Sequence, residues 1–508
     1  MSFLRRRFLQ ASSLGALGTV GGGHLWSQLP SVSAQEVQAK EIAVRLAPDI
    51  EPLVQLIEST PRNDILNVFI RKIKSGLSYQ QLLAALQLAG VRNVQPRPSV
   101  GFKFHSVLVV NSAHLASIAS PDDQRWLPIL WSLDYFKSAQ EQDVRENNWT
   151  MAPVDESGVP HARHAESMFV KAMETWDEPA ADVAAASLAR NVGATRVFEL
   201  FARYSVRDFR SIGHKVIFVA NAWRALQTIG WQHAEPIVRS LAYALQNHEG
   251  SGNPADRDEL ADRPGRENLA RLGEIREDWL DGQLNEAATL EMLSTLREGN
   301  YQDACTAVVK QLNNGVAPQS IWDAMFASAS EMLMRQPGIV ALHTLTTSNA
   351  MRFAFDNCGN DETRKLILLQ NAAFLPMFRA ETERRGDVGK QRIDELVPAD
   401  GETVSDSVLG EIMNSIGKNN TTAAAKTLAY LNNGGDPVPL MDAARLLIFR
   451  KGTDSHDYKF SAAVLEDFYH ISPAWRNRCL AASVFKLRGS GDKDNRLIQQ
   501  ATEALKMA

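Results

Sequence analysis

Apolar residues at helical spacing constrain this chain more than any other feature of its sequence. After Val37 the pattern i, i+3, i+4, i+7 recurs almost everywhere, and the strict alternation that is typical of a half-buried strand is not sustained. Runs rich in Ala, Leu and Gln lie between Gly, Pro and Asn residues, which favour helix ends. The sequence therefore predicts an all-α protein.

A degenerate internal repeat arranges these predicted helices in about four multi-helix blocks. Each block has an apolar helix, a glycine turn, a second helix, a helix that opens with histidine, and a closing apolar helix. The turn glycines, each expected as a left-handed helix C-cap, are Gly76, Gly193, Gly315 and Gly434. Because one block cannot bury its own apolar faces, we expect stacking, either as an open solenoid or as two pseudo-equivalent halves that close on each other.

Polar connectors between the helical runs set the expected boundaries. We predict a signal peptide at residues 1–34, helical blocks at 35–140, 141–250, 284–385 and 386–508, and a charged connector at 251–283.

The N-terminus has the features of an export signal. The three arginines Arg5–Arg7 precede a weakly apolar, glycine-rich run, and Val32–Ala34 offers the small or aliphatic residues of a cleavage site. The Arg-Arg-x-Phe-Leu core resembles the twin-arginine signal. That resemblance implies the twin-arginine export machinery as a partner, cleavage near Ala34, and a periplasmic or otherwise exported protein. The alternative is an uncleaved membrane anchor, although glycines interrupt the apolar run.

Charge and hydropathy exclude some classes of function for the chain beyond residue 34. No other segment reaches the ~18 uninterrupted apolar residues that a membrane-spanning helix needs, so no transmembrane segment is expected. Three of the 54 basic residues and none of the 59 acidic residues lie in residues 1–34, which leaves 51 against 59 and a net charge of −8. A nucleic-acid partner is not expected, because such proteins carry a basic face. Three widely spaced cysteines allow at most one disulfide and form no paired metal site.

A histidine occupies the same point in each block, and the four are His105, His214, His343 and His456, separated by 109, 129 and 113 residues. If the blocks close on a common axis, these side chains converge. A histidine-only set favours a transition metal such as Fe, Cu or Zn, and histidine also serves as an axial haem ligand. The alternative is that each ring satisfies a helix start by donating to a backbone carbonyl, so that the repeat preserves a packing device.

Two further observations bear on these four positions. Asp454 and Asp457 flank His456 and suggest a surface turn, which makes it the least supported member. His114 is a possible extra metal ligand, but nine residues after His105 it points to the opposite face of an ideal helix.

Asparagines follow three of the block histidines by one or two helical turns. Asn111, Asn221 and Asn349 come six, seven and six residues after their histidines. We interpret them as cofactor-binding residues, which would orient metal ligands or contact a substrate.

The stretch DFRSIGHKVIFVANAWRALQTIGWQHAEPIVRSLA, residues 208–242, resembles a helical module that accompanies Rieske iron–sulfur domains in some bacterial proteins. There too, Gly-His opens a helix and Gly-Trp precedes the next. The likeness covers one or two blocks. More loosely, paired helices that start with histidine are similar to questin-oxidase-like proteins, which are helical and implicated in oxygenation. These resemblances imply a redox-associated function. The residues to which they assign that function are His214 and its equivalents in the other blocks. The iron–sulfur cluster itself is not implied, because C-x-H with a downstream C-x-x-H is missing.

Two hypotheses of function follow. The first is an exported oxidoreductase-like protein with a histidine-lined internal metal or cofactor site and a small-molecule substrate. The second is a non-enzymatic solenoid that binds a protein or polymer partner through its concave face. Acyl and phosphoryl transfer have no support, because G-x-S-x-G, Walker and G-x-G-x-x-G motifs are absent. Imidazoles more than about 15 Å apart would exclude a single metal site.

Overall fold

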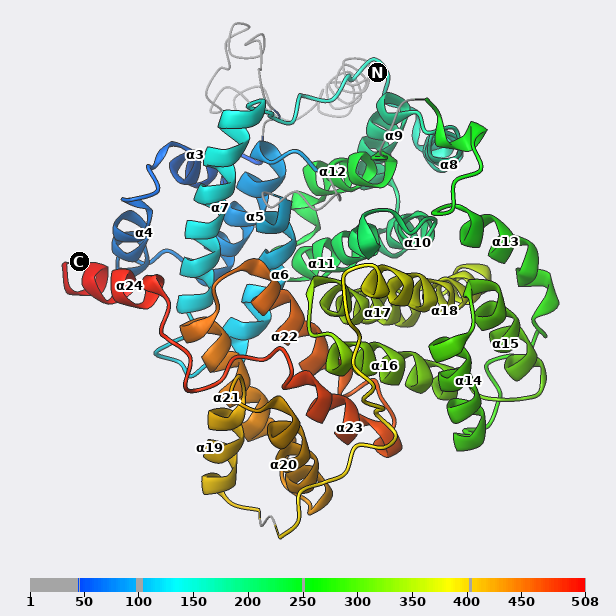
Figure 1. Cartoon of the computed structure of the whole chain (residues 1–508). Helices are drawn as coiled ribbons and strands as arrows, with labels where there is room; N and C mark the ends of the chain where they lie inside the picture. Colours follow the sequence, from blue (N-terminus) through cyan, green and yellow to red (C-terminus); the bar gives the residue numbers. More distant parts are fainter. Residues whose placement is uncertain (1–43, 45, 97–103, 249–251, 402–403, 508) are drawn as a thin grey trace, which may run out of the picture. The chain divides into compact units, whose positions relative to one another are not determined.

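The computed structural model describes residues 44, 46–96, 104–248, 252–401 and 404–507 (Figure 1). In this part of the chain the regular elements are helices, and β-type pairing is limited to an isolated bridge between Gln283 and Val316. The prediction of an all-α protein is therefore confirmed. The predicted signal peptide, residues 1–34, lies outside the described residues, as does its cleavage site near Ala34.

Among the described residues, the first three predicted blocks hold five α-helices each and the fourth holds six. The first contains α3 (Glu51–Ser59), α4 (Ile65–Lys74), α5 (Tyr79–Asn93), α6 (His105–Ile118) and α7 (Leu127–Glu146). The second contains α8 (Ala165–Thr175), α9 (Glu178–Asn191), α10 (Ala194–Ser205), α11 (His214–Ile229) and α12 (Ala234–Gln246). The third contains α14 (Glu286–Glu298), α15 (Tyr301–Asn313), α16 (Pro318–Arg335), α17 (Ile339–Asn357) and α18 (Asp361–Glu383). The fourth contains α19 (Asp406–Ser415), α20 (Asn420–Asn432), α21 (Pro437–Lys451), α22 (Ser455–Asp467) and α23 (Pro473–Ser483).

The remaining elements lie within or between these blocks. Helix α7 continues past the predicted boundary at residue 140, the charged connector contains a helix of its own, and the fourth block ends with a sixth helix, α24 (Arg496–Met507). The other elements are η4 (Ala162–His164), η5 (Arg210–Gly213), η6 (Trp231–His233), η7 (Pro254–Asp256), α13 (Arg263–Arg271) and η8 (Leu272–Glu274).

The blocks are not separate domains. Residues Ala43–Ala508 form one compact unit, and a single hydrophobic core extends from Ile50, before α3, to Ala504 in α24. Helices α6, α11, α16 and α17 are buried on nearly every side, which explains why their sequences lack a polar face. The histidine helices thus lie in the interior.

The four histidine helices pack in a ring near the middle of the molecule (Figure 1). Helix α6 packs against α11, α11 against α17, α17 against α22, and α22 against α6. The last of these contacts joins the first and fourth blocks. In an open solenoid each block meets only its neighbours in the sequence, so the described residues close on themselves instead.

The turn glycines behave as predicted in three of the four blocks. Gly76, Gly315 and Gly434 have φ values of +102°, +80° and +85° and follow α4, α15 and α20, where a left-handed C-cap was expected. The expectation is wrong for Gly193, whose φ is −62° and which is the N-cap of α10. There α9 ends in the extended residue Val192, so the reversal needs no left-handed residue.

Two further expectations from the sequence concern membrane-spanning segments, of which none was predicted, and disulfides, of which at most one was allowed. Among the described helices none is both long and apolar enough to span a bilayer. The three cysteines, Cys305, Cys358 and Cys479, are buried and unpaired, so no disulfide contributes to the fold.

Candidate metal centre

The block histidines come together inside the ring of helices. The Nε2 atom of His214 lies 3.2 Å from that of His105 and 3.2 Å from that of His343. Candidate ligand atoms of these three residues all lie within 4.8 Å of one another, so the group could hold a metal ion. The His456 ring completes the group, with its centroid 4.7 Å from that of His105 and 5.2 Å from that of His343.

The spacing of the ring nitrogens suits a small ion. A tetrahedral ion with nitrogen ligands at about 2.05 Å places those nitrogens about 3.3 Å apart, close to the 3.2 Å observed here. A haem does not fit the same residues, because its macrocycle would have to lie between ring nitrogens that are almost in contact. Of the two cofactors expected from the sequence, the geometry therefore matches the bare transition metal.

Backbone carbonyls fix the orientation of two of these rings. The Nδ1–H of His214 donates to Ser211 O at 2.5 Å, and the Nδ1–H of His343 donates to Ile339 O at 2.7 Å. Since a carbonyl can only accept, Nδ1 carries the proton in both neutral rings and Nε2 presents a lone pair. Nδ1 thus makes the bond to a backbone carbonyl that the sequence suggested for these histidines. Nε2 is not used in that bond and is available to a ligand.

The two lone pairs face each other with no proton between them. His214 Nε2 and His343 Nε2, 3.2 Å apart, are both acceptors and cannot hydrogen-bond while the rings are neutral. Protonating one ring would supply a donor, but burial, together with the nearby charge of Lys459, holds the pKa of His214 and of His343 well below the usual value. A metal cation satisfies both lone pairs without protonation.

The same environment keeps the third ring neutral. Burial first, and then the charge of Lys459 and the other imidazoles, lowers the pKa of His105 well below 6.5. His105, His214 and His343 are 2%, 1% and 0% exposed, so water does not relieve that effect. Metal ligation requires unprotonated imidazole, which is the form that these positions favour.

A strained turn places His214 at the start of α11. Ser211, Ile212 and Gly213 have φ values of 55°, 47° and 78°, three left-handed residues in succession. Left-handed backbone is rare for a β-branched residue such as Ile212 and costs about 1–3 kcal/mol per residue. The turn aims Ser211 O at the His214 ring. A Cβ at Gly213 would lie 2.1 Å from Thr347 Oγ1, so α17 leaves room only for glycine.

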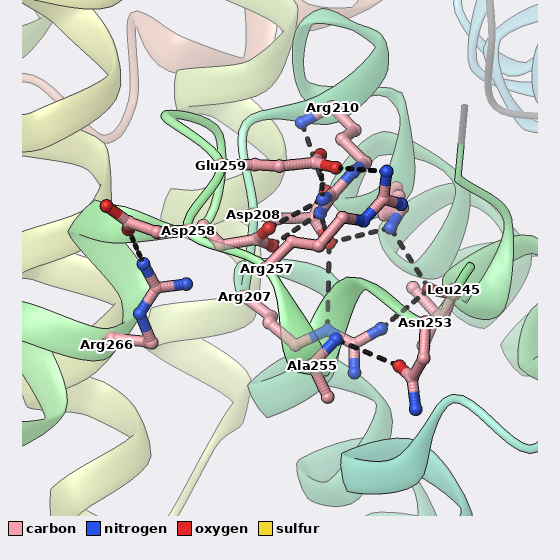
Figure 2. Close-up of polar contacts among 12 residues, drawn as sticks. Arg207, Asp208, Arg210, Leu245, Asn253, Ala255, Arg257, Asp258, Glu259 and Arg266 are labelled. Atoms are coloured by element: carbon pink, nitrogen blue, oxygen red, sulfur yellow. Dashed lines mark hydrogen bonds and ion pairs between the residues drawn. The ribbon is translucent and has the colours of Figure 1, made fainter. Parts of the chain in front are cut away.

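A buried ion cluster anchors the start of this turn. Asp208 is 1% exposed, and its carboxylate accepts from Lys215 Nζ at 2.7 Å and from the Arg210 backbone N–H at 3.1 Å. Figure 2 shows the side chains of Arg207 and Arg210 directed toward Asp208. Burial opposes the carboxylate charge, but the cations of Lys215, Arg207 and Arg210 hold the pKa of Asp208 below its usual value. The cluster ties the turn to the first helical turn of α11.

The three asparagines predicted as cofactor-binding residues lie together beyond the histidines. Asn111, Asn221 and Asn349 all line one internal cavity of about 10 Å³, which is about the volume that one water molecule needs. Lys459 lines the same cavity from α22. The three asparagines thus line one cavity, and their role as cofactor-binding residues stays a prediction.

The asparagines take part in a buried polar network. Asn221 Nδ2 donates to Leu108 O at 3.0 Å, and Asn349 Nδ2 donates to Glu466 Oε2 and Asp467 Oδ1, both at 2.8 Å. Arg224 donates to Glu466 Oε2 at 2.5 Å. These bonds join α6, α11, α17 and α22 around the cavity.

Lys459 and Arg224 were not predicted as site residues from the sequence. Lys459 is 2% exposed, its Nζ has no hydrogen-bond partner, and burial lowers its pKa to about 7. A lysine three residues after His456, between Tyr458 and Phe460, lies on the inner face of an apolar helix, and that spacing was the available signal. Arg224 lies three residues after Asn221 on the same helix face and could have been found in the same way.

The interpretation of the His456 turn as a surface turn is wrong for Asp457, although Asp454 is partly exposed. Asp457 is 2% exposed and accepts from Arg488 at 2.8 Å, and Asp454 caps α22 by accepting from the His456 backbone N–H at 2.7 Å. The His456 ring lies with Nδ1 3.2 Å from Asp454 Oδ1, while its Nε2 is buried and without a partner. Asp454 therefore caps the start of α22 with its side chain partly exposed, whereas Asp457 is buried.

His114 is not brought to this group. Its Nδ1 lies 3.0 Å from Tyr79 Oη, its Nε2 lies 3.5 Å from Thr228 Oγ1, and burial lowers its pKa. Helix α6 begins at His105, so the two histidines face opposite sides of one helix, and the metal-ligand role considered for His114 is not supported.

A groove on the surface adjoins the internal cavity. It has a volume of about 770 Å³ and lies between the end of α6 and helices α21 and α22. The groove and the cavity share Leu115, Ala462 and Glu466 in their linings. The groove therefore lies next to the cavity that the asparagines line.

Comparison with family models, with curated proteins and with solved structures finds no match for the chain.

Proposed function

We propose that this protein is a metalloprotein that binds one transition-metal ion through the histidine tetrad, defined as His105, His214, His343 and His456. The observation that carries the proposal is the pair of Nε2 acceptors 3.2 Å apart in His214 and His343, whose Nδ1–H groups both donate to carbonyls. Buried acceptors that face each other are costly unless a cation lies between them.

We further propose that the ion is iron or copper and that the protein is oxidoreductase-like. Imidazole-only sites suit Fe, Cu and Zn, and the groove beside the cavity would give a small molecule a short path to the centre. The resemblance of residues 208–242 to a module that accompanies Rieske domains supports redox work. The contacts between α22 and α6 count against the alternative, a non-enzymatic solenoid with an open concave face.

Elemental analysis of protein purified through its own export route tests the metal site. We expect about one equivalent of metal per chain, and a spectrum of a histidine-ligated ion if that metal is iron or copper. The double variant H214A/H343A should lose the metal, while H164A, on the exposed helix η4, should retain it. Metal-free wild-type protein that also fails to take up Fe, Cu or Zn in solution would refute the site, and bound zinc alone would refute the redox role.

Export through the twin-arginine machinery is part of the proposal and rests on residues 1–34. Replacing Arg5 and Arg6 by lysine should leave the protein in the cytoplasmic fraction, because that machinery reads the arginine pair. Export of the variant at the wild-type level would argue against this route.

A further inference from the structure

Two buried donors without acceptors line the cavity of the asparagines, and one of them, Lys459, is close enough for its charge to act on His105, His214 and His343. Lys459 Nζ and Asn111 Nδ2 are both buried, neither has a hydrogen-bond partner, and both residues belong to the lining of the same cavity. A buried donor that makes no hydrogen bond is unfavourable, and more so if it is charged. A species bound between these two donors should therefore have hydrogen-bond acceptors and no donors.

The charge of a bound ion adds a second requirement. Four neutral imidazoles leave a dication uncompensated, and a buried charge without a counter-charge is strongly unfavourable. Asp454, beside a His456 ring that is neutral as a metal ligand, offsets one of these charges from outside the cavity, and Glu466 is already paired with Arg224. Burial raises the pKa of Asp467 well above its usual value, which favours its uncharged form. The described residues around the cavity therefore supply no free negative charge.

The size of the cavity and its surroundings limit what can enter. A volume of about 10 Å³ accommodates one water-sized particle. The surface groove provides the approach, since Leu115, Ala462 and Glu466 line both spaces. A monatomic anion such as chloride meets the requirements of size, charge and acceptor character, whereas an organic acid is too large.

We propose that the metal-bound protein takes up one small inorganic anion from solvent and holds it beside the histidine tetrad, with Lys459 Nζ and Asn111 Nδ2 as donors. This inference rests on the proposed function. Because binding is reciprocal, the anion strengthens metal binding as much as the metal strengthens anion binding. Typical coupling of this kind changes affinity about 5–150-fold.

The test compares zinc affinity in two salts of equal ionic strength. Zinc binding to the full chain is measured by competition with a chelator in sodium chloride and in sodium gluconate, whose anion exceeds the cavity, with correction for zinc–chloride complexes. We expect affinity about tenfold higher in chloride for wild type. K459M should bind zinc more tightly than wild type in gluconate and lose most of the chloride effect.

Two further variants keep the result interpretable. N111A removes the second donor and should reduce the chloride effect, and K171M removes an exposed lysine from α8 and should leave the effect intact. Equal zinc affinity of wild type in both salts overturns the anion site but not the metal site. An undiminished chloride effect in both K459M and N111A also overturns it. Failure of wild type to bind zinc, iron or copper in either salt overturns both proposals.

Discussion

Acid should destabilise the metal-free protein through three buried histidines. In the unfolded chain a histidine has a pKa of about 6.5, whereas burial and the charge of Lys459 hold the pKa of His105, His214 and His343 well below that value in the fold. The unfolded state therefore binds more protons as the pH falls. The stability is fully present above about pH 6.5 and is lost as the pH decreases toward the folded-state pKa values.

The size of this effect follows from proton linkage. Lowering the pH from about 7.5 to about 5.5 costs about 1.4 kcal/mol for each histidine that protonates only in the unfolded chain. Three such residues give about 4 kcal/mol, a large part of the ~5–15 kcal/mol that is typical of a protein's total stability. All three residues are at most 2% exposed, so no discount for solvent screening applies.

Urea unfolding followed by far-ultraviolet circular dichroism, at a series of pH values, measures this loss. The variant H343Q should lose about 1.4 kcal/mol less than wild type over the same interval, because one of the three histidines is gone. H164Q controls for the replacement of an imidazole at the exposed helix η4. The reasoning is refuted if the free energy of unfolding of wild type does not fall with pH, or if H343Q retains the full wild-type loss.

Three other predictions follow from the same structure. G213A should destabilise the fold by about 2–5 kcal/mol, because Gly213 has a left-handed backbone and a Cβ there would clash with Thr347. In a double-mutant cycle of urea unfolding, adding T347A should restore only the part of this free energy that the clash causes. D208N should cost about 3–5 kcal/mol because it leaves Lys215 buried and unpaired, whereas D258N, which breaks an exposed pair with Arg266, should cost less than about 1 kcal/mol in the same assay. Metal at about 100 times its Kd should stabilise by about 2.7 kcal/mol, which for the unit Ala43–Ala508 raises Tm by roughly 3 °C in calorimetry; an unchanged Tm would contradict specific binding to the folded state.

The fold class could be predicted because helical periodicity is a local property. The spacing of apolar residues depends only on neighbours within one or two helical turns. Comparison of one block with the next shows the recurring histidines His105, His214, His343 and His456. The exception at Gly193 arose because a turn can be built from extended residues as well as from a left-handed glycine.

Convergence of the histidines could not be predicted, because it depends on how the first and fourth blocks meet. A repeat that stays open and a repeat that closes have the same local pattern, and the contact of α22 with α6 decides between them. The same ambiguity led to the misinterpretation of His456, since acidic neighbours are found both on surface turns and at buried helix caps. Lys459 was missed because lysine is ordinarily taken for a surface residue.

The ring formed by α6, α11, α17 and α22 has a consequence for the order of events during synthesis. Its last member enters the growing chain only when nearly the whole protein has been made, and until then the first three histidines have no closed interior around them. If the tetrad binds an ion as proposed, the complete site exists only after α22 has been made and has packed against α6. The compartment in which folding finishes would then determine which ion is available to it.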